Sequence, residues 1–535
     1  MTTFKRRNII YLAALMVFLS ATSCNKILEQ QPKNSTYLQQ FWKSASDCEY
    51  AIAGNYALLR DVLTNFNNRY YMYGDAVANT YFTIDYNGDG LEGIQSGNYT
   101  FQYNLEALGN WTKYYKVIAM SNTILKQVPK ITDAQLESSG SVDDPTVYRN
   151  KILGEALFIR ALTYFQMVKI WGDVPLVTDA YDDPISAPQL PRSPKADVMA
   201  QIEKDCLQAA GFLRWGYQDK SNVAVRANKG SVFALLAHFY LWRATTTNLS
   251  TSDPIMADVD KASAAIDSIT TFGGYTLVDT ANYGKQFIGR SSESIFEIYM
   301  SEDSKEGSYQ HIGFQFLVSP YVNGFGTTHR YWVPSGYLDN HYHYLGVDSL
   351  DANGDPVSDA YGNRIAWFDT LDVRYRNNFA LVSSDKPTCL KYANVTYRNP
   401  GTQTDPYLSN NMIIFRLSDM LLLRAEIALY RNDLSTAIDI INGWKIRNGD
   451  DWHFFVDNTW SRDDLMYEYI RERGKELYLE GHIFWDLIRT RQYSNFIPWL
   501  DDSRFQQGGF YWPVDPTLFR DNRFLVQTSY WRGKV

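Results

Sequence analysis

The chain has 535 residues, with 51 Lys and Arg against 59 Asp and Glu, and its formal net charge is −8 at pH 7. No basic cluster offsets the acidic residues, which argues against a nucleic acid as partner. Aromatic residues make up 15% of the chain, including 39 Tyr and 14 Trp. That is more than a core needs, and such a surplus suits either stacking on sugar rings or a protein interface.

The first 23 residues have the organisation of a secretion signal. The positive residues 5–7 precede an apolar run, 9–19, that is too short to span a bilayer as a mature helix. Small residues then lead to Cys24 in the order LSATSC, which resembles a lipobox. We therefore predict a signal peptide over 1–23, acylation of Cys24, and a tether over 24–36. Asn25 favours the outer membrane, and the alternative is an ordinary signal peptide followed by a coincidental cysteine.

The mature chain alternates between helical patterns and short breaks. Apolar residues recur at helical spacing in four pairs of segments, and each pair predicts a helical hairpin. A further helix is predicted over 462–491, and alternation in SIFEIYM, 294–300, predicts a strand. The predicted pairs are 37–61 with 105–128, 148–170 with 195–212, 225–243 with 257–271, and 412–430 with 434–447.

These patterns predict a mostly α fold in which hairpins of tetratricopeptide-like length form a scaffold. Segments 37–274 and 411–535 supply the scaffold, and 275–410 is an irregular, loop-rich insertion with a few short strands. No linker of real size divides the chain, so residues 37–535 are predicted to form a single domain.

The last quarter of the chain resembles the SusD/RagB family. Residues of the family's R-x-x-[DE], L-x-[RY]-AE, IN-x-x-R and ER-x-x-EL-x-x-EG-x-x-[FW]-DL-x-R patterns occur in order, with spacings that differ by one or two residues at Leu423, Arg447 and Trp485. They are Arg416, Asp419, Leu423, Ala425, Glu426, Ile441, Asn442, Arg447, Glu472, Arg473, Glu476, Leu477, Glu480, Gly481, Trp485, Asp486, Leu487 and Arg489. Segments 41–56, 155–176 and 511–530 are similar to the family's other landmarks, whereas 275–410 shows no match. The resemblance implies a scaffold of helical hairpins, in which Trp485 and Leu487 are expected to be buried. It also implies an outer-membrane lipoprotein that binds glycans, or sometimes peptides, over a TonB-dependent transporter.

Three carboxylates, Glu472, Glu476 and Glu480, lie at i, i+4 and i+8 and suggest acid–base work on a glycosidic bond. Carboxylates of one helix do not flank a substrate from two sides, so ion pairs between helices are the favoured interpretation. His238, on an apolar helix face, is interpreted as a satisfied core residue. We therefore predict no catalytic residue, no cofactor and no metal site.

Two Asp/Asn runs, 85–90 and 351–355, open like calcium loops, but both lack the Glu at loop position twelve. Turns rich in Asp and Asn are therefore favoured over calcium sites. Three cysteines remain once Cys24 is acylated, and Cys48 and Cys206 are interpreted as small buried residues. No Cys/His spacing suggests zinc.

Aromatic rings next to amide or charged side chains suit sugar binding, because a ring packs on the C–H face while polar groups meet the hydroxyls. Two segments, 65–75 and 328–344, have this composition. The predicted ligand-binding residues are Asn68, Arg69, Tyr71, Tyr73, Tyr309, Trp332, Tyr337 and Tyr342. The alternative is that these rings cover the insertion or contact a protein partner.

The sequence thus favours a non-catalytic lipoprotein facing the cell exterior. It is expected to bind oligosaccharides and to deliver them to a TonB-dependent outer-membrane transporter. A peptide-binding member of the same family and, as a rival class, a glycoside hydrolase on the same scaffold are the alternatives.

Overall fold

The structure is a computed structural model, and it describes residues 41–534 except 85–91, 100–107, 139, 182–186, 218, 302, 304–310, 321, 329, 349–352, 354–356, 359–365, 369–370 and 451. The side chains of residues 65–68, 343–348 and 366–368 are also outside the described part. Cys24 and both Asp/Asn runs that open like calcium loops therefore fall wholly or largely outside it.

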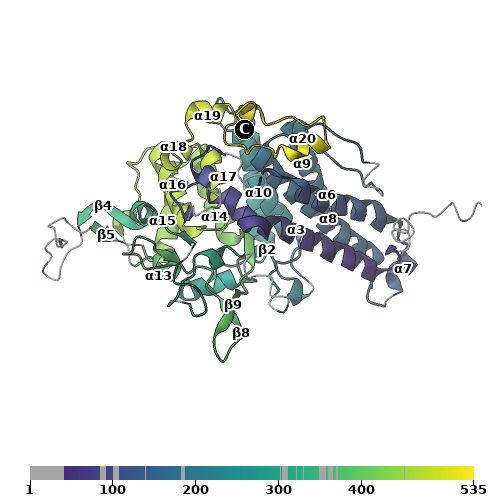
Figure 1. The fold of residues 1–535 in the computed structure, drawn as a ribbon, viewed down its shortest axis with the longest axis horizontal. Helices are drawn as coiled ribbons and strands as arrows, with labels where there is room; N and C mark the ends of the chain where they lie inside the picture. The colour runs from purple at the N-terminus through teal and green to yellow at the C-terminus, as the bar shows by residue number, and fades with distance from the viewer. Residues whose placement is uncertain are drawn as a thin grey trace, which may run out of the picture.

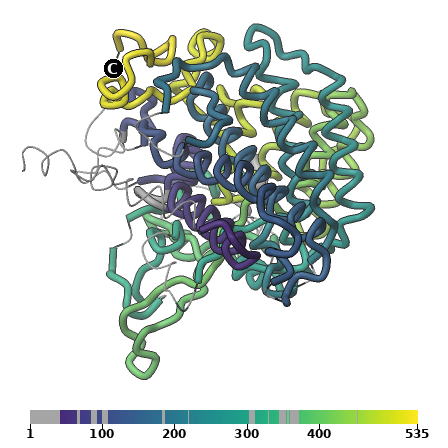
Figure 2. The backbone as a smooth tube through the Cα atoms, turned by 90° about the vertical axis from the view of Figure 1, so that its right-hand side faces the viewer, coloured from purple at the N-terminus to yellow at the C-terminus, as the bar shows by residue number. Residues whose placement is uncertain are grey.

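Antiparallel helical hairpins build the scaffold, as predicted (Figures 1 and 2). All four predicted pairs contact each other, and the mostly α fold class is confirmed. The pairs are α3 (Ala45–Gly74) with α6 (Thr112–Gln127), α8 (Pro145–Trp171) with α9 (Lys195–Phe212), α10 (Lys229–Thr246) with α11 (Met256–Phe272), and α14 (Leu417–Tyr430) with α15 (Leu434–Asn448).

Side-chain caps fix where several of these helices begin. The Asp144 carboxylate accepts hydrogen bonds from the amides of Thr146 and Val147 at the start of α8. Asn228 and Ser231 form a reciprocal capping box at the start of α10. Helix α8 ends at Gly172, whose φ of 72° is favoured by glycine.

Three boundaries differ from the prediction. Helix α3 continues to Gly74 rather than ending near 61, because the added turns bury Val62, Leu63 and Met72. Residues Met412–Arg416, predicted as the first turn of a helix, form strand β10, which is buried throughout. The helix predicted over 462–491 is broken into α16 (Arg462–Glu476) and α17 (Ile483–Thr490) by a turn in which Gly481 has φ 78°.

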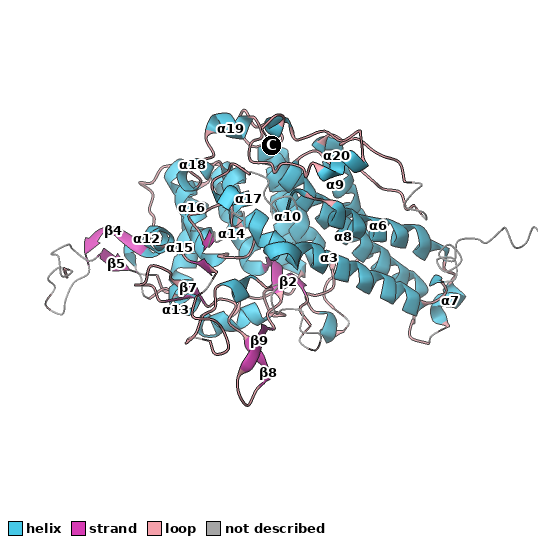
Figure 3. Cartoon of the chain, viewed as in Figure 1, coloured by secondary structure: helices cyan, strands magenta, loops and turns pink. Residues whose placement is uncertain are grey.

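The predicted strand near 294 is confirmed as β2 (Ser294–Ile298), and it pairs antiparallel with β10. Other described strands form short antiparallel pairs (Figure 3). They are β1 (Thr83–Ile84) with β3 (Tyr331–Trp332), β4 (His343–Asp348) with β5 (Ala366–Phe368), β6 (Phe379–Ala380) with β7 (Thr388–Cys389), and β8 (Val395–Asn399) with β9 (Thr404–Leu408).

Shorter helical elements connect these parts. The α-helical ones are α4 (Glu92–Gln95), α7 (Asp133–Glu137), α12 (Ser335–Tyr342), α13 (Val373–Asn378), α18 (Tyr493–Phe496), α19 (Asp502–Gln506) and α20 (Thr517–Asp521). The 3-10 helices are η2 (Val128–Lys130), η4 (Lys220–Asn222), η5 (Thr280–Ile288), η6 (Ile312–Gln315), η7 (Trp452–Phe454) and η8 (Ser529–Trp531).

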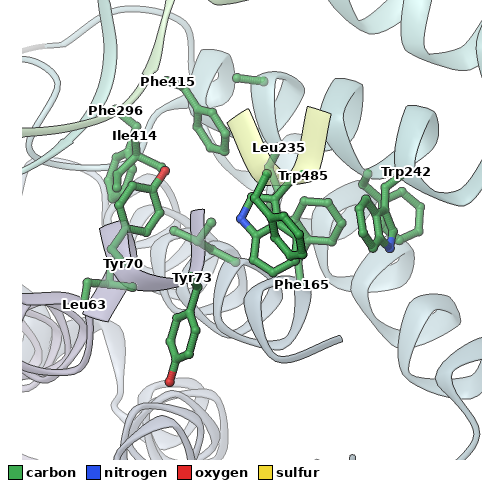
Figure 4. Packing of buried hydrophobic residues seen from close by; sticks show 14 of the residues in the cluster. Leu63, Tyr70, Tyr73, Phe165, Leu235, Trp242, Phe296, Ile414, Phe415 and Trp485 are labelled. Atoms are coloured by element: carbon green, nitrogen blue, oxygen red, sulfur yellow. The ribbon is translucent and has the colours of Figure 1, made fainter. Parts of the chain in front are cut away.

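The core joins the two ends of the chain (Figure 4). Trp485 is 3% exposed and Leu487 is fully buried, as predicted, and the Trp485 ring meets Trp242 edge to face at 5.9 Å. The C-terminal segment returns to the scaffold, where the Trp512 amide donates to the Ile170 carbonyl at 2.7 Å. The three remaining cysteines are free and buried, in agreement with the prediction for Cys48 and Cys206.

Candidate functional site

The rings predicted from segment 65–75 do not lie in a loop. Tyr71 and Tyr73 belong to the last turns of α3 and are 0% and 2% exposed. The Tyr73 ring packs edge to face on Trp171 and Trp512, and its hydroxyl donates to the Leu108 carbonyl at 2.5 Å. The prediction of ligand contact by Tyr71 and Tyr73 is therefore wrong, since both are core residues.

The prediction of ligand contact by Arg69 is also wrong. It is 3% exposed, and its Nη1 lies 3.4 Å from the Asn110 carbonyl. The Asn68 side chain and all of Tyr309 are outside the described residues, so their predicted roles stay predictions.

The two tyrosines predicted from segment 328–344 lie in α12 and are buried as well. Tyr337 packs against Tyr478 with ring centroids 4.6 Å apart, and its hydroxyl donates to the Gly474 carbonyl at 3.2 Å. Tyr342 has no exposed surface and packs on Tyr375 at 5.3 Å. Both predictions of ligand contact are wrong, because a short helix follows Pro334 and turns these rings toward α16.

Among the predicted residues whose side chains the structure describes, Trp332 reaches the surface. Strand β3 pairs with β1, so that Trp332 lies opposite Thr83 while Tyr331 lies opposite Ile84. Side chains alternate across a strand, and accordingly Tyr331 and Ile84 are buried whereas Trp332 and Thr83 are partly exposed.

The Lys386 ammonium lies 4.2 Å from the centroid of the Trp332 ring. It reaches this position because the Val333 amide donates to the Pro387 carbonyl at 2.9 Å, which joins the two segments. We call Thr83, Trp332 and Lys386 the β1–β3 face. The face combines an indole ring, a hydroxyl and an ammonium donor, which are the groups that sugar recognition uses. It also joins the insertion to the segment after α3, at residues 83–84.

The carboxylates Glu472, Glu476 and Glu480 are at most 1% exposed, and each has a cationic partner from another element. Arg374 of α13 binds Glu472 at 2.6 Å, and Arg416 binds Glu476 at 2.7 Å and Glu480 at 2.8 Å. The interpretation as ion pairs is confirmed, although Arg416 belongs to strand β10 and not to a helix. Buried and paired carboxylates of this kind cannot meet a substrate.

One buried cluster has the residue types of a metal site. The ligand atoms of His238, Asp419 and His482 lie within 4.8 Å of one another. However, Asp419 accepts from His238 Nε2 at 2.7 Å and from Arg473 Nη2 at 2.6 Å. Burial raises the Asp419 pKa, but His238 and Arg473 outweigh it and hold that pKa well below its usual range. Because Arg473 already supplies the positive charge, we assign the cluster to the core, which confirms the interpretation of His238.

None of the helices in the described ranges has the length and apolar character needed to cross a bilayer.

Comparison with known proteins gives two family matches. A family model described as "Starch-binding associating with outer membrane" matches residues 26–241, and the SusD family model matches residues 380–531. SusD-like protein P38 of Formosa agariphila is 24% identical over 515 residues, which cover 92% of this chain and 93% of that protein. A SusD-like protein of Bacteroides ovatus is 31% identical over 148 residues, or 27% of this chain and 24% of that protein.

Solved structures share the fold. A SusD homolog from Bacteroides thetaiotaomicron superposes with a TM-score of 0.74 at 20% identity, covering 92% of this chain and all of that one. B. fragilis NanU superposes with a TM-score of 0.65 at 22% identity, covering 94% of this chain and 99% of that one. With matching family models over both the N-terminal helices and the C-terminal third, and the same fold over nearly its whole length, the chain belongs to the SusD/RagB family.

Proposed function

We propose that this protein is a non-catalytic outer-membrane lipoprotein that binds oligosaccharides on the cell exterior and delivers them to a TonB-dependent transporter. Family membership supports the class, and the description of the N-terminal match, starch binding in association with the outer membrane, supports a glycan as ligand. The lipobox-like sequence ending at Cys24 supports lipid anchoring.

The choice of binding surface rests on how three side chains are arranged. On the β1–β3 face, the partly exposed Trp332 ring has the Lys386 ammonium over it and Thr83 across the strand pair. A sugar ring would pack its C–H face on the indole, while the ammonium and the hydroxyl meet its own hydroxyls.

The acidic motif of α16 and the turn after it does not support glycoside hydrolysis by this chain. Hydrolysis uses two carboxyl groups that flank the scissile bond from opposite sides. Glu472, Glu476 and Glu480 instead neutralise buried arginines and a lysine. A peptide ligand remains the second candidate within the family, because an aromatic ring next to an ammonium also suits a peptide with an acidic residue.

Binding is tested with the full-length protein in detergent against a panel of neutral and acidic polysaccharides. Gel retardation and isothermal titration should detect at least one glycan ligand, and no reducing sugar should be released from any of them. Release of reducing sugar would establish the hydrolase, and binding confined to peptides would establish the second candidate. Delivery is tested by affinity purification from native outer membranes, which should retain a TonB-dependent transporter.

A further inference from the structure

A cavity of about 760 Å³ lies at the N-terminal ends of α3 and α8. Helix α7 contacts both of these helices, and its label in Figure 1 marks this end of the molecule. Glu49 of α3, Lys151 and Glu155 of α8, and the connection between α9 and α10 form its walls. Its volume falls in the range typical of pockets for small ligands. None of its lining residues belongs to the β1–β3 face.

The back of this pocket is fixed by charges that compensate one another. Arg226 binds Glu155 through two nitrogens, at 2.5 and 2.9 Å, and Glu49 at 3.0 Å. Lys151 binds the same Glu49 at 3.3 Å. The Tyr56 hydroxyl donates a hydrogen bond to Glu155 at 2.8 Å, so the Glu155 carboxylate has both Arg226 and Tyr56 as partners. These groups hold one another in place and so shape the pocket. Two cations and two carboxylates balance, so together they add no net charge to it.

Hydrogen bonds hold the described part of the connection between α9 and α10 in place. The Lys229 amide donates to the Arg214 carbonyl at 2.9 Å, and the Tyr217 hydroxyl donates to the Ile295 carbonyl at 3.3 Å. Ala224 adopts φ 61°, a strained conformation for a residue with a Cβ. Strain of this kind persists where the surroundings over-determine the backbone, and it is concentrated at ligand sites and switches.

Three side chains on this connection are available to a ligand. The Arg214 guanidinium and the Asn222 amide have no hydrogen-bond or ion-pair partner within the described ranges, and both line the pocket. Trp215 stacks on Phe233 with centroids 5.5 Å apart and planes 14° apart, and it remains partly exposed on the pocket wall. The pocket therefore offers an ordered ring, an amide and an uncompensated cation.

A second hollow of about 540 Å³ adjoins the first, since both are lined by Glu49, Lys151 and Arg214. It extends to Tyr50, whose side chain is 70% exposed. The groups along this path are thus the Trp215 ring, the uncompensated Arg214 and the Tyr50 ring. This spacing suits a chain of linked units better than one compact molecule.

We propose that this pocket is a second carbohydrate site that takes a short saccharide bearing an acidic group, such as a uronate. This inference rests on the proposed glycan-binding function but uses different residues. Trp215 supplies the stacking ring, the Asn222 amide meets hydroxyls, and the Arg214 guanidinium pairs with the carboxylate in a charge-assisted contact. An acidic saccharide is favoured over an acidic peptide because the cation lies between two rings.

The test uses isothermal titration of the full-length protein in detergent with trigalacturonate and with the neutral trisaccharide maltotriose. Trigalacturonate should bind more tightly than maltotriose. Arg214→Gln should weaken trigalacturonate at least about tenfold, as expected for loss of a hydrogen bond between charged groups. Arg214→Lys should restore part of the loss, because it keeps the charge but not the planar fork.

Arg520→Gln is the matched control, since Arg520 lies in α20 with its side chain 80% exposed and the substitution removes the same charge. Its affinity for trigalacturonate should be unchanged. The proposal is overturned if trigalacturonate does not bind or if Arg214→Gln binds it with unchanged affinity. It is also overturned if Arg214→Gln and Arg520→Gln lose equal affinity for trigalacturonate, or if tetra-aspartate binds more tightly than trigalacturonate does. Loss with Trp332→Ala but not with Arg214→Gln would overturn the second site while supporting the β1–β3 face.

Discussion

Arg374 and Glu472 form an ion pair with a nitrogen–oxygen distance of 2.6 Å in which neither side chain has any exposed surface. Arg374 belongs to α13 and Glu472 to α16, so the pair ties the segment between β2 and β10 to the helices that follow it. The same guanidinium also binds Asp372 at 2.7 Å and Asp450 at 3.2 Å. One buried arginine thus holds together three parts of the chain.

Arg374→Met should destabilise the protein by about 3–5 kcal/mol, because the buried Asp372, Asp450 and Glu472 lose the guanidinium that they share and keep mainly Lys475 as a cation. The urea midpoint of unfolding measures the effect. Arg398→Met is the matched control, since Arg398 pairs with Asp405 at the surface, where the side chains are 41% and 46% exposed. Its effect should stay within about 1 kcal/mol. Equal midpoints for the two variants would show that the buried pair is not structural.

Trp485→Ala should lower the free energy of unfolding by about 3–5 kcal/mol, because the ring fills the core between α8, α10 and α17. Figure 4 shows this ring among Phe165, Leu235 and Trp242. Trp452→Ala serves as control, because Trp452 is 68% exposed, and it should change stability by no more than about 0.5 kcal/mol. A thermal melt of Trp485→Ala that matches the unsubstituted protein would contradict the packing described.

Asp75 gives a prediction about pH. Burial raises the pKa of this carboxyl well above its usual range, although the Gly481 amide donates to it at 2.8 Å. Between the unfolded and the folded pKa, the folded state therefore holds a proton on Asp75 that the unfolded state has lost. This contribution to stability is fully present below the unfolded pKa and is lost as pH rises through the folded pKa.

Asp75→Asn removes this loss of stability at higher pH, since the Asn amide does not titrate and its carbonyl can still accept the hydrogen bond from the Gly481 amide. The variant should gain stability relative to the unsubstituted protein as pH rises from 5 to 8, by up to about 1.4 kcal/mol per unit inside that window. Urea midpoints at several pH values measure the difference. A difference that is independent of pH would mean that Asp75 titrates alike in both states.

Trp332→Ala should weaken binding of the glycan identified by titration roughly tenfold, or about 1.4 kcal/mol, with little change in stability. The physical reason is loss of the stacking surface on the β1–β3 face. Trp452→Ala removes an exposed ring elsewhere and should leave affinity unchanged. Full affinity in Trp332→Ala would place the glycan on another surface.

Cys24→Ala should abolish acylation completely while leaving the fold intact, because the thiol is the attachment point for the diacylglycerol. Incorporation of labelled palmitate in whole cells measures this. Cys48→Ala should retain the label, since Cys48 is buried in α3. Label that persists in Cys24→Ala would refute lipid anchoring.

Local patterns in the sequence determined the helical hairpins, because the repeat of apolar positions that predicts a helix lies within one segment. The same holds for the ordered matches between Arg416 and Arg489, which identify the family, and for the buried positions of Trp485 and Leu487. These features depend on residues close together in the chain.

Tertiary structure decided which rings meet solvent. Tyr71 and Trp332 both stand beside polar residues, but α3 continues and is covered by the C-terminal segment, whereas β3 pairs with β1 and leaves Trp332 outside. The partner of Glu472 is Arg374, 98 residues away, and the pocket around Arg214 joins three helices. Burial and pairing depend on what packs across a side chain, and segments distant in the sequence supply those neighbours.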